Sequence, residues 1–160
     1  MNIWPELEVP RTQRPFPKLK LAYTSGNADL DVKSDQFKLY VCGITPYDAT
    51  HLGHAATYLT FDLINRYLQL AGTSVKFVEN ITDIDDPLFE RAKRDNQSWA
   101  QLGESQVALF TSDMTALRIL PPANYVAVTE AMDSIIFAFE NLVDKNFTYE
   151  LAGNIYFRIE

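Results

Sequence analysis

The chain has 160 residues, of which 47% are hydrophobic and 22% are charged, so its composition is that of one globular domain and excludes a disordered or collagen-like chain. Its net charge of -7 opposes binding to nucleic acid by neutralisation of phosphates. No signal-peptide pattern opens the sequence, and no segment approaches the ~18 uncharged residues of a membrane helix. We therefore predict a cytoplasmic protein that binds neither nucleic acid nor membrane, and the sequence leaves its oligomeric state open.

Residues 1–36 are predicted to form an N-terminal arm and a hairpin. Four of the eight prolines lie among the first 17 residues. Because proline fixes the backbone and removes a hydrogen-bond donor, we expect an extended arm that wraps over the body. The turn signal Ser25-Gly26-Asn27 separates two short runs, 19–24 and 29–33, which are expected to be strands.

Residues 37–145 are predicted to form the first half of a Rossmann-like nucleotide-binding domain with added helices. The runs 38–42 and 75–80 have the composition of buried strands, and residues 52–70 between them have helical periodicity. The apolar stripe of this helix comprises Ala56, Leu59, Leu63, Tyr67 and Leu70, and Ile64 and Leu68 widen it. Two strands joined by such a helix form a parallel, right-handed unit, so the predicted fold class is α/β with a doubly wound parallel sheet.

Three further helices are predicted at 86–95, 99–117 and 130–145. Ser98 and Gln101 have the spacing of a capping box, and Thr129 is the predicted N-cap of the last helix. Residues 146–160 are predicted to begin a hairpin that turns near 152–154, in a chain that is truncated. Because two parallel strands cannot cover the apolar helix faces, we expect an exposed hydrophobic patch of more than roughly a few hundred Å².

The most informative segment is CGITPYDATHLGH at 42–54, between the first parallel strand and its helix. Ligands bind at the carboxyl ends of the strands in such a sheet, and a helix N-terminus attracts phosphate. His51 and His54 would place two imidazoles on one side of the first helical turn, and Gly53 leaves room for a nucleotide. A single histidine at a helix start is more often a local hydrogen-bonding residue, but this pair in this context favours ATP binding.

Two other features allow simple structural interpretations. As an isolated cysteine at the end of a buried strand, Cys42 would pack as a small hydrophobe. The acidic run Asp83, Asp85 and Asp86 could hold Mg²⁺, but aspartate before Pro87 at a helix start is what N-capping predicts. We therefore assign no metal to the acidic run.

The H-x-G-H pattern resembles the first signature of class I aminoacyl-tRNA synthetases. The segments 40–43, 47–53 and 80–86 resemble cysteinyl-tRNA synthetase in particular. Five residues depart from that family, which has proline, valine, asparagine, arginine and lysine in their places: Ile44, Pro46, His54, Ala56 and Pro87. The segments 43–57 and 85–92 are instead similar to the paralogous ligase family of mycothiol biosynthesis, which joins cysteine to the amino group of glucosaminyl-inositol.

The resemblance implies the N-terminal part of a class I synthetase catalytic domain in an AMP-forming ligase, with ATP, Mg²⁺, cysteine and the amino sugar-inositol as ligands. His51 and His54 would be catalytic, by stabilising charge on the phosphates. Contacts with ATP or the adenylate are predicted for Cys42, Gly43, Ile44, Thr45, Gly53, Thr57, Asn80, Ile81 and Thr82.

The resemblance also implies that Cys42 is a zinc ligand, because both related families have a zinc-binding cysteine at this position. Zinc prefers about four ligands, and the chain has one cysteine and two histidines, so the other ligands are expected outside this segment. The chain also lacks the second, lysine-rich signature of class I enzymes, so the 160-residue piece is expected to be inactive by itself.

Two alternative functions stay open at this point. A cysteinyl-tRNA synthetase would share the first reaction step and would pass cysteine to tRNA. A non-catalytic nucleotide-binding module would bind a nucleotide without either step.

Overall fold

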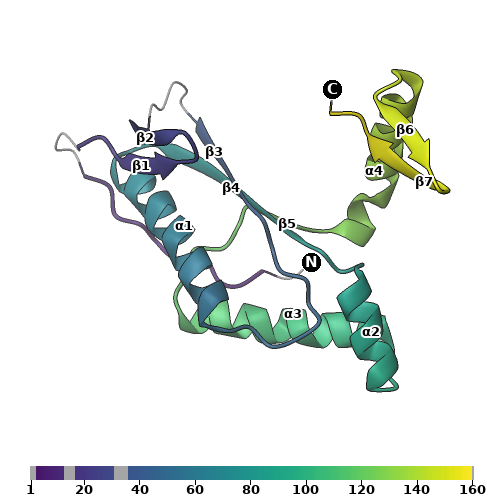
Figure 1. Ribbon diagram of the computed structural model, residues 1–160. Coiled ribbons are helices and arrows are strands. Elements are labelled where there is room, and N and C mark those ends of the chain that lie inside the picture. Colours follow the sequence, from purple (N-terminus) through teal and green to yellow (C-terminus); the bar gives the residue numbers. More distant parts are fainter. Residues whose placement is uncertain (1–2, 13–16, 31–35, 160) are drawn as a thin grey trace.

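The computed structural model describes residues 3–12, 17–30 and 36–159 (Figure 1). Its elements, in chain order, are β1 (Lys20–Tyr23), β2 (Gly26–Asp29), β3 (Gln36–Val41), α1 (Leu52–Leu70), β4 (Ser74–Ile81), α2 (Asp86–Arg94), α3 (Trp99–Ala116), β5 (Asn124–Ala127), α4 (Val128–Asp144), β6 (Thr148–Leu151) and β7 (Asn154–Phe157). No helix within these described ranges is long and apolar enough to cross a membrane.

The centre of the fold is a parallel sheet with the strand order β3-β4-β5. Val41 of β3 pairs with Glu79 of β4, and Ile81 of β4 pairs with Ala127 of β5, so the carboxyl ends of all three strands meet at one edge. Helices α1 and α3 lie on the same side of this sheet (Figure 1). The predicted α/β class with a parallel sheet is confirmed.

Strand β5 is absent from the sequence prediction, which treats the region after Pro121-Pro122 as a separator between helices. The strand has four residues, and only Tyr125 and Ala127 face the core. So short a run has no periodicity of its own, and its extended conformation comes from its pairing with β4.

The main core lies between the sheet and the two helices. Trp4 of the N-terminal arm packs edge-on against Phe110 and Tyr125, with ring centroids 5.9 and 5.7 Å apart, and its indole nitrogen donates to the carbonyl of Ile119 at 2.8 Å. The arm therefore contributes a fully enclosed aromatic side chain to the core. A smaller cluster of Leu88, Ala92 and Leu102 joins α2 to α3.

Helix α1 contacts the body through a face that shares only Leu68 with its predicted apolar stripe. The buried residues are Tyr58, Asp62, Asn65 and Leu68, whereas Leu63 is 67% exposed. Asp62 is buried because its carboxylate accepts from the amide of Leu120 at 2.8 Å and from Arg66 at 2.6 Å. These bonds satisfy a buried charge that the hydrophobic pattern does not predict.

Several predicted caps and turns need correction. Ser98 is the N-cap of α3 but makes no side-chain capping bond, so the predicted capping box with Gln101 is wrong. Helix α4 begins at Val128, so Thr129 is in its first turn and is not its N-cap. The β1–β2 turn is at 24–25, earlier than predicted, and positions 31–33 of the predicted second strand lie outside the described residues.

The C-terminal unit of α4, β6 and β7 stands apart from the rest of the molecule (Figure 1). Its hairpin turns at Ala152-Gly153, as predicted, with φ of +52° and +77°, the conformation of a tight type I′ turn. None of the α4 residues is buried. Its large exposed side chains are Ile135, Ile136, Phe137, Phe139 and Val143. These side chains are exposed apolar surface, and the predicted size of the hydrophobic patch stays a prediction.

Candidate functional site

The loop that connects β3 to α1 passes directly against the end of β4. A side-chain carbon built on Gly43 would lie 1.5 Å from the carbonyl oxygen of Asn80, so only glycine fits. The Asn80 side chain accepts from the Gly43 amide at 3.0 Å and from the Tyr40 hydroxyl at 2.8 Å. The amide of Thr82 donates to the carbonyl of Ile44 at 2.9 Å. These bonds hold residues 43–45 at the carboxyl edge of the sheet.

His51 and His54 cap the N-terminus of α1 reciprocally. Nδ1 of His51 accepts from the Gly53 amide at 3.0 Å, and Nδ1 of His54 accepts from the His51 amide at 3.2 Å. A neutral imidazole that accepts at Nδ1 carries its proton on Nε2. The two rings, with centroids 4.1 Å apart, therefore present two neutral N–H donors side by side.

The environment favours the neutral form of His54. Burial lowers the pKa of His54, and the neighbouring His51 lowers it further because two adjacent positive charges repel each other. A side-chain carbon on Gly53 would lie 2.8 Å from the His51 ring, so this glycine leaves the space that the ring occupies. The pair is thus built to donate hydrogen bonds to an anion.

A cavity of about 360 Å³ opens beside these histidines. Its lining comprises Gly43, Ile44, Thr45, Tyr47, Asp48, Ala49, Thr50, His51 and His54. Five residues predicted from the sequence therefore come together here. They are Gly43, Ile44, Thr45, His51 and His54.

The other predicted contacts do not line this cavity. Thr57 is exposed one turn further along α1 and donates to the carbonyl of Gly53 at 3.1 Å. Asn80 and Thr82 form hydrogen bonds with the backbone of the loop at Gly43 and Ile44. The Ile81 side chain is fully buried in the core. Cys42 is exposed, so the interpretation of this cysteine as a packed core residue is wrong.

Sequence reasoning missed the side chains that anchor the loop from outside. Arg91 of α2 pairs with Asp48 at 3.0 Å and donates to the carbonyl of Tyr47 at 3.1 Å. Asp113 of α3 accepts from the hydroxyl of Thr50, the residue that precedes His51 in the sequence. These partners are 43 or more positions away in sequence, and no local pattern could connect them.

The acidic run has structural roles. Asp85 is the N-cap of α2, where it accepts from the Asp86 amide at 2.9 Å, and it also accepts from the Thr45 hydroxyl at 3.3 Å. Asp83 accepts from the amide of Thr129 at 3.0 Å and from its hydroxyl. The interpretation of this run as helix capping is confirmed for Asp85.

The described residues do not form a complete zinc site. The Cys42 thiol is exposed, and within residues 3–12, 17–30 and 36–159 no three histidine, cysteine, aspartate or glutamate side chains cluster as a metal site. Since zinc takes about four ligands, the Cys42 thiol alone does not constitute a zinc site.

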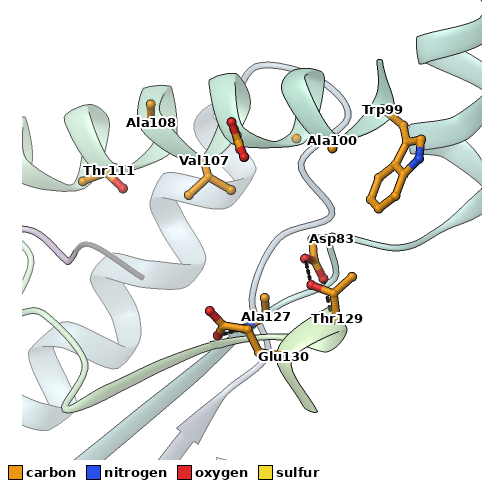
Figure 2. Close-up of a pocket in the computed structure, with 11 residues that line it drawn as sticks. Asp83, Trp99, Ala100, Val107, Ala108, Thr111, Ala127, Thr129 and Glu130 are labelled. Atoms are coloured by element: carbon orange, nitrogen blue, oxygen red, sulfur yellow. Dashed lines mark hydrogen bonds between the residues drawn. The ribbon is translucent and has the colours of Figure 1, made fainter. Parts of the chain in front are cut away.

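A second cavity, of about 660 Å³, lies at the same edge of the sheet beyond β4 and β5. Figure 2 shows Trp99, Val107 and Thr111 on helix α3, opposite Asp83, Ala127, Thr129 and Glu130. The sequence gives no signal for this cavity, because three separate elements form it.

Comparison with known proteins decides the family. Residues 29–160 match the family described as tRNA synthetases class I (C) catalytic domain. The chain belongs to this family. The resemblance of the H-x-G-H segment to class I synthetases is therefore confirmed, and the histidine pair of this class I catalytic domain lies where its signature predicts.

Curated relatives of this class I domain carry the name of a ligase. The Corynebacterium jeikeium protein named L-cysteine:1D-myo-inositol 2-amino-2-deoxy-alpha-D-glucopyranoside ligase 2 is 49% identical over 98% of this chain and 38% of its own length. A Gordonia bronchialis ligase, whose name differs only in lacking the number, is 49% identical over 100% of this chain and 40% of its own length. The chain thus spans about two fifths of these relatives, and its similarity to the mycothiol ligases is confirmed.

Solved structures support the fold of the class I domain. The Mycobacterium tuberculosis methionyl-tRNA synthetase in complex with methionyl-adenylate aligns with a TM-score of 0.66 at 20% identity, over 71% of this chain and 23% of that protein. A LeuRS of Agrobacterium radiobacter, in a ternary complex with tRNA, aligns with a TM-score of 0.60 at 22% identity, over 73% of this chain and 16% of its own. These similarities establish the Rossmann-like fold.

Proposed function

We propose that this chain is the nucleotide-binding part of an ATP-dependent ligase that activates cysteine and transfers it to the amino group of glucosaminyl-inositol. The observation that carries the proposal is the His51–His54 pair, with two Nε2–H donors beside the cavity at the carboxyl edge of the sheet. The names of relatives that are 49% identical supply the substrate class.

The proposed reaction has two steps. A carboxylate oxygen of cysteine attacks the α-phosphorus of ATP, and pyrophosphate leaves with Mg²⁺ as its counterion. The amine nitrogen then attacks the carbonyl carbon of the cysteinyl adenylate, the carbon–oxygen bond to AMP breaks, and the amine loses a proton. Adenylation is required because a free carboxylate is a poor electrophile.

The histidine pair would act on the phosphates. Negative charge spreads over the phosphate oxygens during the first step, and two preorganised neutral donors stabilise it without moving a proton. The α1 N-terminus adds the positive end of its dipole. We assign further adenylate contacts to Gly43, Ile44 and Thr45, whose backbone and hydroxyl groups line the same cavity.

Other assignments rest on the family resemblance and on position. We assign contacts with the adenylate or the cysteine to Cys42, Gly53, Thr57 and to the end of β4 at Asn80, Ile81 and Thr82. Cys42 is also the one zinc ligand that we assign to the described residues. Because ATP is made available in the cytoplasm, the proposal places the reaction there.

The second candidate is a cysteinyl-tRNA synthetase, which the class I tRNA synthetase description of the matched family favours. The net charge of -7 opposes it, because an acidic surface repels a polyanionic RNA and attracts an amino sugar that is partly cationic near neutral pH.

An acceptor assay tests the proposal. The full-length enzyme that contains this chain is given ATP, Mg²⁺ and cysteine, and AMP release is measured after adding either glucosaminyl-inositol or tRNA. We expect turnover with the amino sugar alone. Charging of tRNA without turnover on the amino sugar would replace the proposal with the second candidate.

A further inference from the structure

The cavity beyond β4 and β5 has the size and lining of a small-molecule site. Its volume of about 660 Å³ lies within the ~300–1,000 Å³ usual for ligand pockets. One wall is helix α3, and the opposite wall is the end of β5 with the first turn of α4 (Figure 2). Ala100, Val107, Ala108 and Ala127 make much of this lining apolar.

The charged groups of this lining are all acidic. Asp83, Glu104 and Glu130 line the cavity, and none of its other lining residues is a lysine, arginine or histidine. Asp83 is bonded to Thr129, and Glu130 accepts from the Ala127 amide at 3.2 Å. Glu104 has neither a hydrogen bond nor an ion pair with any residue in the described part of the chain, so its carboxylate is available to a ligand.

Trp99 gives the cavity an aromatic surface held in a fixed orientation. Trp99 is 39% exposed, and its ring packs edge-on against Phe89, with centroids 5.4 Å apart and an interplanar angle of 81°. The negative face of an indole attracts the partly positive C–H bonds of a sugar ring and also attracts a cation. An aromatic face beside an unpaired carboxylate suits a molecule with a ring and an ammonium group.

The cavity is linked to the nucleotide site through the backbone. Asp83 directly follows Thr82, whose amide donates to the carbonyl of Ile44 at 2.9 Å, and Ile44 lines the cavity beside the histidines. Both cavities therefore lie at the same edge of the sheet, where the acceptor has to meet the adenylate.

We propose that this second cavity binds the cationic amino sugar, with the pyranose ring on Trp99 and the ammonium group attracted by Glu104. The proposal rests on the function proposed above and extends it to the place where the acceptor is recognised. Asp83 and Glu130 keep carboxylate oxygens that can accept from sugar hydroxyls. These residues recognise the ammonium form of the acceptor, which loses a proton to solvent before the free amine attacks the adenylate, and we assign no proton transfer to them.

Calorimetric titration of the full-length enzyme that contains this chain gives a direct test, because Trp99 and Glu104 both line the cavity. The protein is titrated with glucosaminyl-inositol and, separately, with its N-acetylated, uncharged form. Glu104→Gln keeps the shape and removes the charge, and Glu90→Gln removes an exposed carboxylate outside the cavity as the matched control.

We expect Glu104→Gln to weaken binding of the amino sugar by roughly five- to tenfold, with Glu90→Gln unchanged. The wild type should bind the N-acetylated form more weakly than it binds the amino sugar. The wild type and Glu104→Gln should bind the N-acetylated form with equal affinity. Trp99→Leu, which removes the aromatic ring from the cavity, should give a similar loss. Wild-type affinity in both Glu104→Gln and Trp99→Leu, or equal affinity for the uncharged form, would overturn the proposal.

The AMP-release assay separates this proposal from the proposed function. If the wild type turns over with the amino sugar and the cavity variants keep the wild-type KM for it, only the location of the acceptor site is wrong. If the wild type neither binds the amino sugar nor turns over with it, the proposed function itself is wrong.

Discussion

The backbone amide of Gly43 donates a 3.0 Å hydrogen bond to the side-chain oxygen of Asn80, which joins the loop after β3 to the end of β4. The same oxygen accepts from the Tyr40 hydroxyl at 2.8 Å, and the Asn80 amide group donates to the Thr82 hydroxyl at 3.3 Å. One asparagine side chain therefore links two strand ends, and the position of the loop that lines the cavity beside His51 and His54 depends on it.

Substitution of either partner should displace this loop. Asn80→Ala leaves the Gly43 amide without its acceptor, and we expect a loss of about 1–3 kcal/mol in the free energy of unfolding. Gly43→Ala forces the backbone apart, because its side chain would lie 1.5 Å from the Asn80 carbonyl oxygen. Nucleotide affinity by calorimetry and thermal unfolding check both variants.

Gly103→Ala is the control for thermal unfolding, since its side chain would meet its nearest neighbour at an ordinary 3.7 Å. A helical glycine with room for a methyl group should gain stability of up to about 1 kcal/mol when replaced by alanine. Equal effects of Gly43→Ala and Gly103→Ala would contradict the close approach between the loop and β4.

The histidine pair should control the adenylation step. Removal of one preorganised donor, in His51→Ala or His54→Ala, should lower cysteine-dependent ATP–pyrophosphate exchange by on the order of 10²-fold. Exchange at the wild-type rate in both variants would contradict this role.

The helix cap formed by these histidines should also depend on pH. The pKa of His54 is lowered from its ordinary 6.5, first by burial and then by His51, so the folded state binds fewer protons than the unfolded state just below pH 6.5. Stability should therefore fall as the pH drops from 6.5 through the lowered pKa. His54→Gln, measured by thermal unfolding across this range, should flatten the dependence.

The buried carboxyl of Glu79 should give the opposite dependence. It is 1% exposed, and burial raises its pKa from 4.5 to about 8, with the Tyr58 hydroxyl offsetting part of the rise. The folded state holds a proton that the unfolded state has lost, so stability should decline as the pH rises from 4.5 to about 8. Glu79→Gln cannot ionise, and its unfolding temperature should lose this decline. An unchanged slope would place the titration elsewhere.

Arg91 should matter more for the position of the loop between β3 and α1 than for the stability of the fold. It pairs with Asp48 and Asp95 and donates to the Tyr47 carbonyl, whereas the neighbouring Arg94 pairs with Asp95 alone among its described contacts. Arg91→Ala should raise the KM for ATP by roughly threefold with little change in unfolding temperature. Arg94→Ala is the matched control, and an equal effect of the two substitutions would refute the positioning role.

Cys42→Ser tests the proposed zinc ligand. A neutral hydroxyl replaces thiolate poorly at zinc, so metal content and cysteine-dependent pyrophosphate exchange should both fall. ATP affinity, which does not depend on the thiol, is the internal control. Normal metal content with normal exchange in the variant would leave Cys42 as an exposed thiol without a metal role.

Local patterns predicted the elements whose conformation is decided locally. Helix 52–70 and the two strands beside it follow from periodicity, and the C-terminal hairpin follows from its Ala152-Gly153 turn. Strand β5 could not be predicted, because its four residues become a strand only through pairing with β4. Thr129 failed as a predicted cap because Asp83, 46 positions away, binds it.

Part of the candidate site could also be predicted from the sequence. The residues that the signature places in one loop and one helical turn do meet around one cavity. Asn80 and Thr82 bond to the loop after β3, and their predicted contacts with a ligand stay a prediction. Arg91, Asp113 and the second cavity escaped prediction because they depend on how α2, α3 and α4 pack, which no spacing in the sequence encodes.

The parallel order of β3, β4 and β5 also sets the order in which the molecule can assemble. The hairpins β1–β2 and β6–β7 join neighbouring residues and can form quickly, but β3 and β4 pair only after the whole of α1 has been made. Contacts of such long sequence separation slow folding, since loop closure precedes any gain from pairing. Both cavities need these late pairings, so ligand binding should be the last property that a refolding molecule regains.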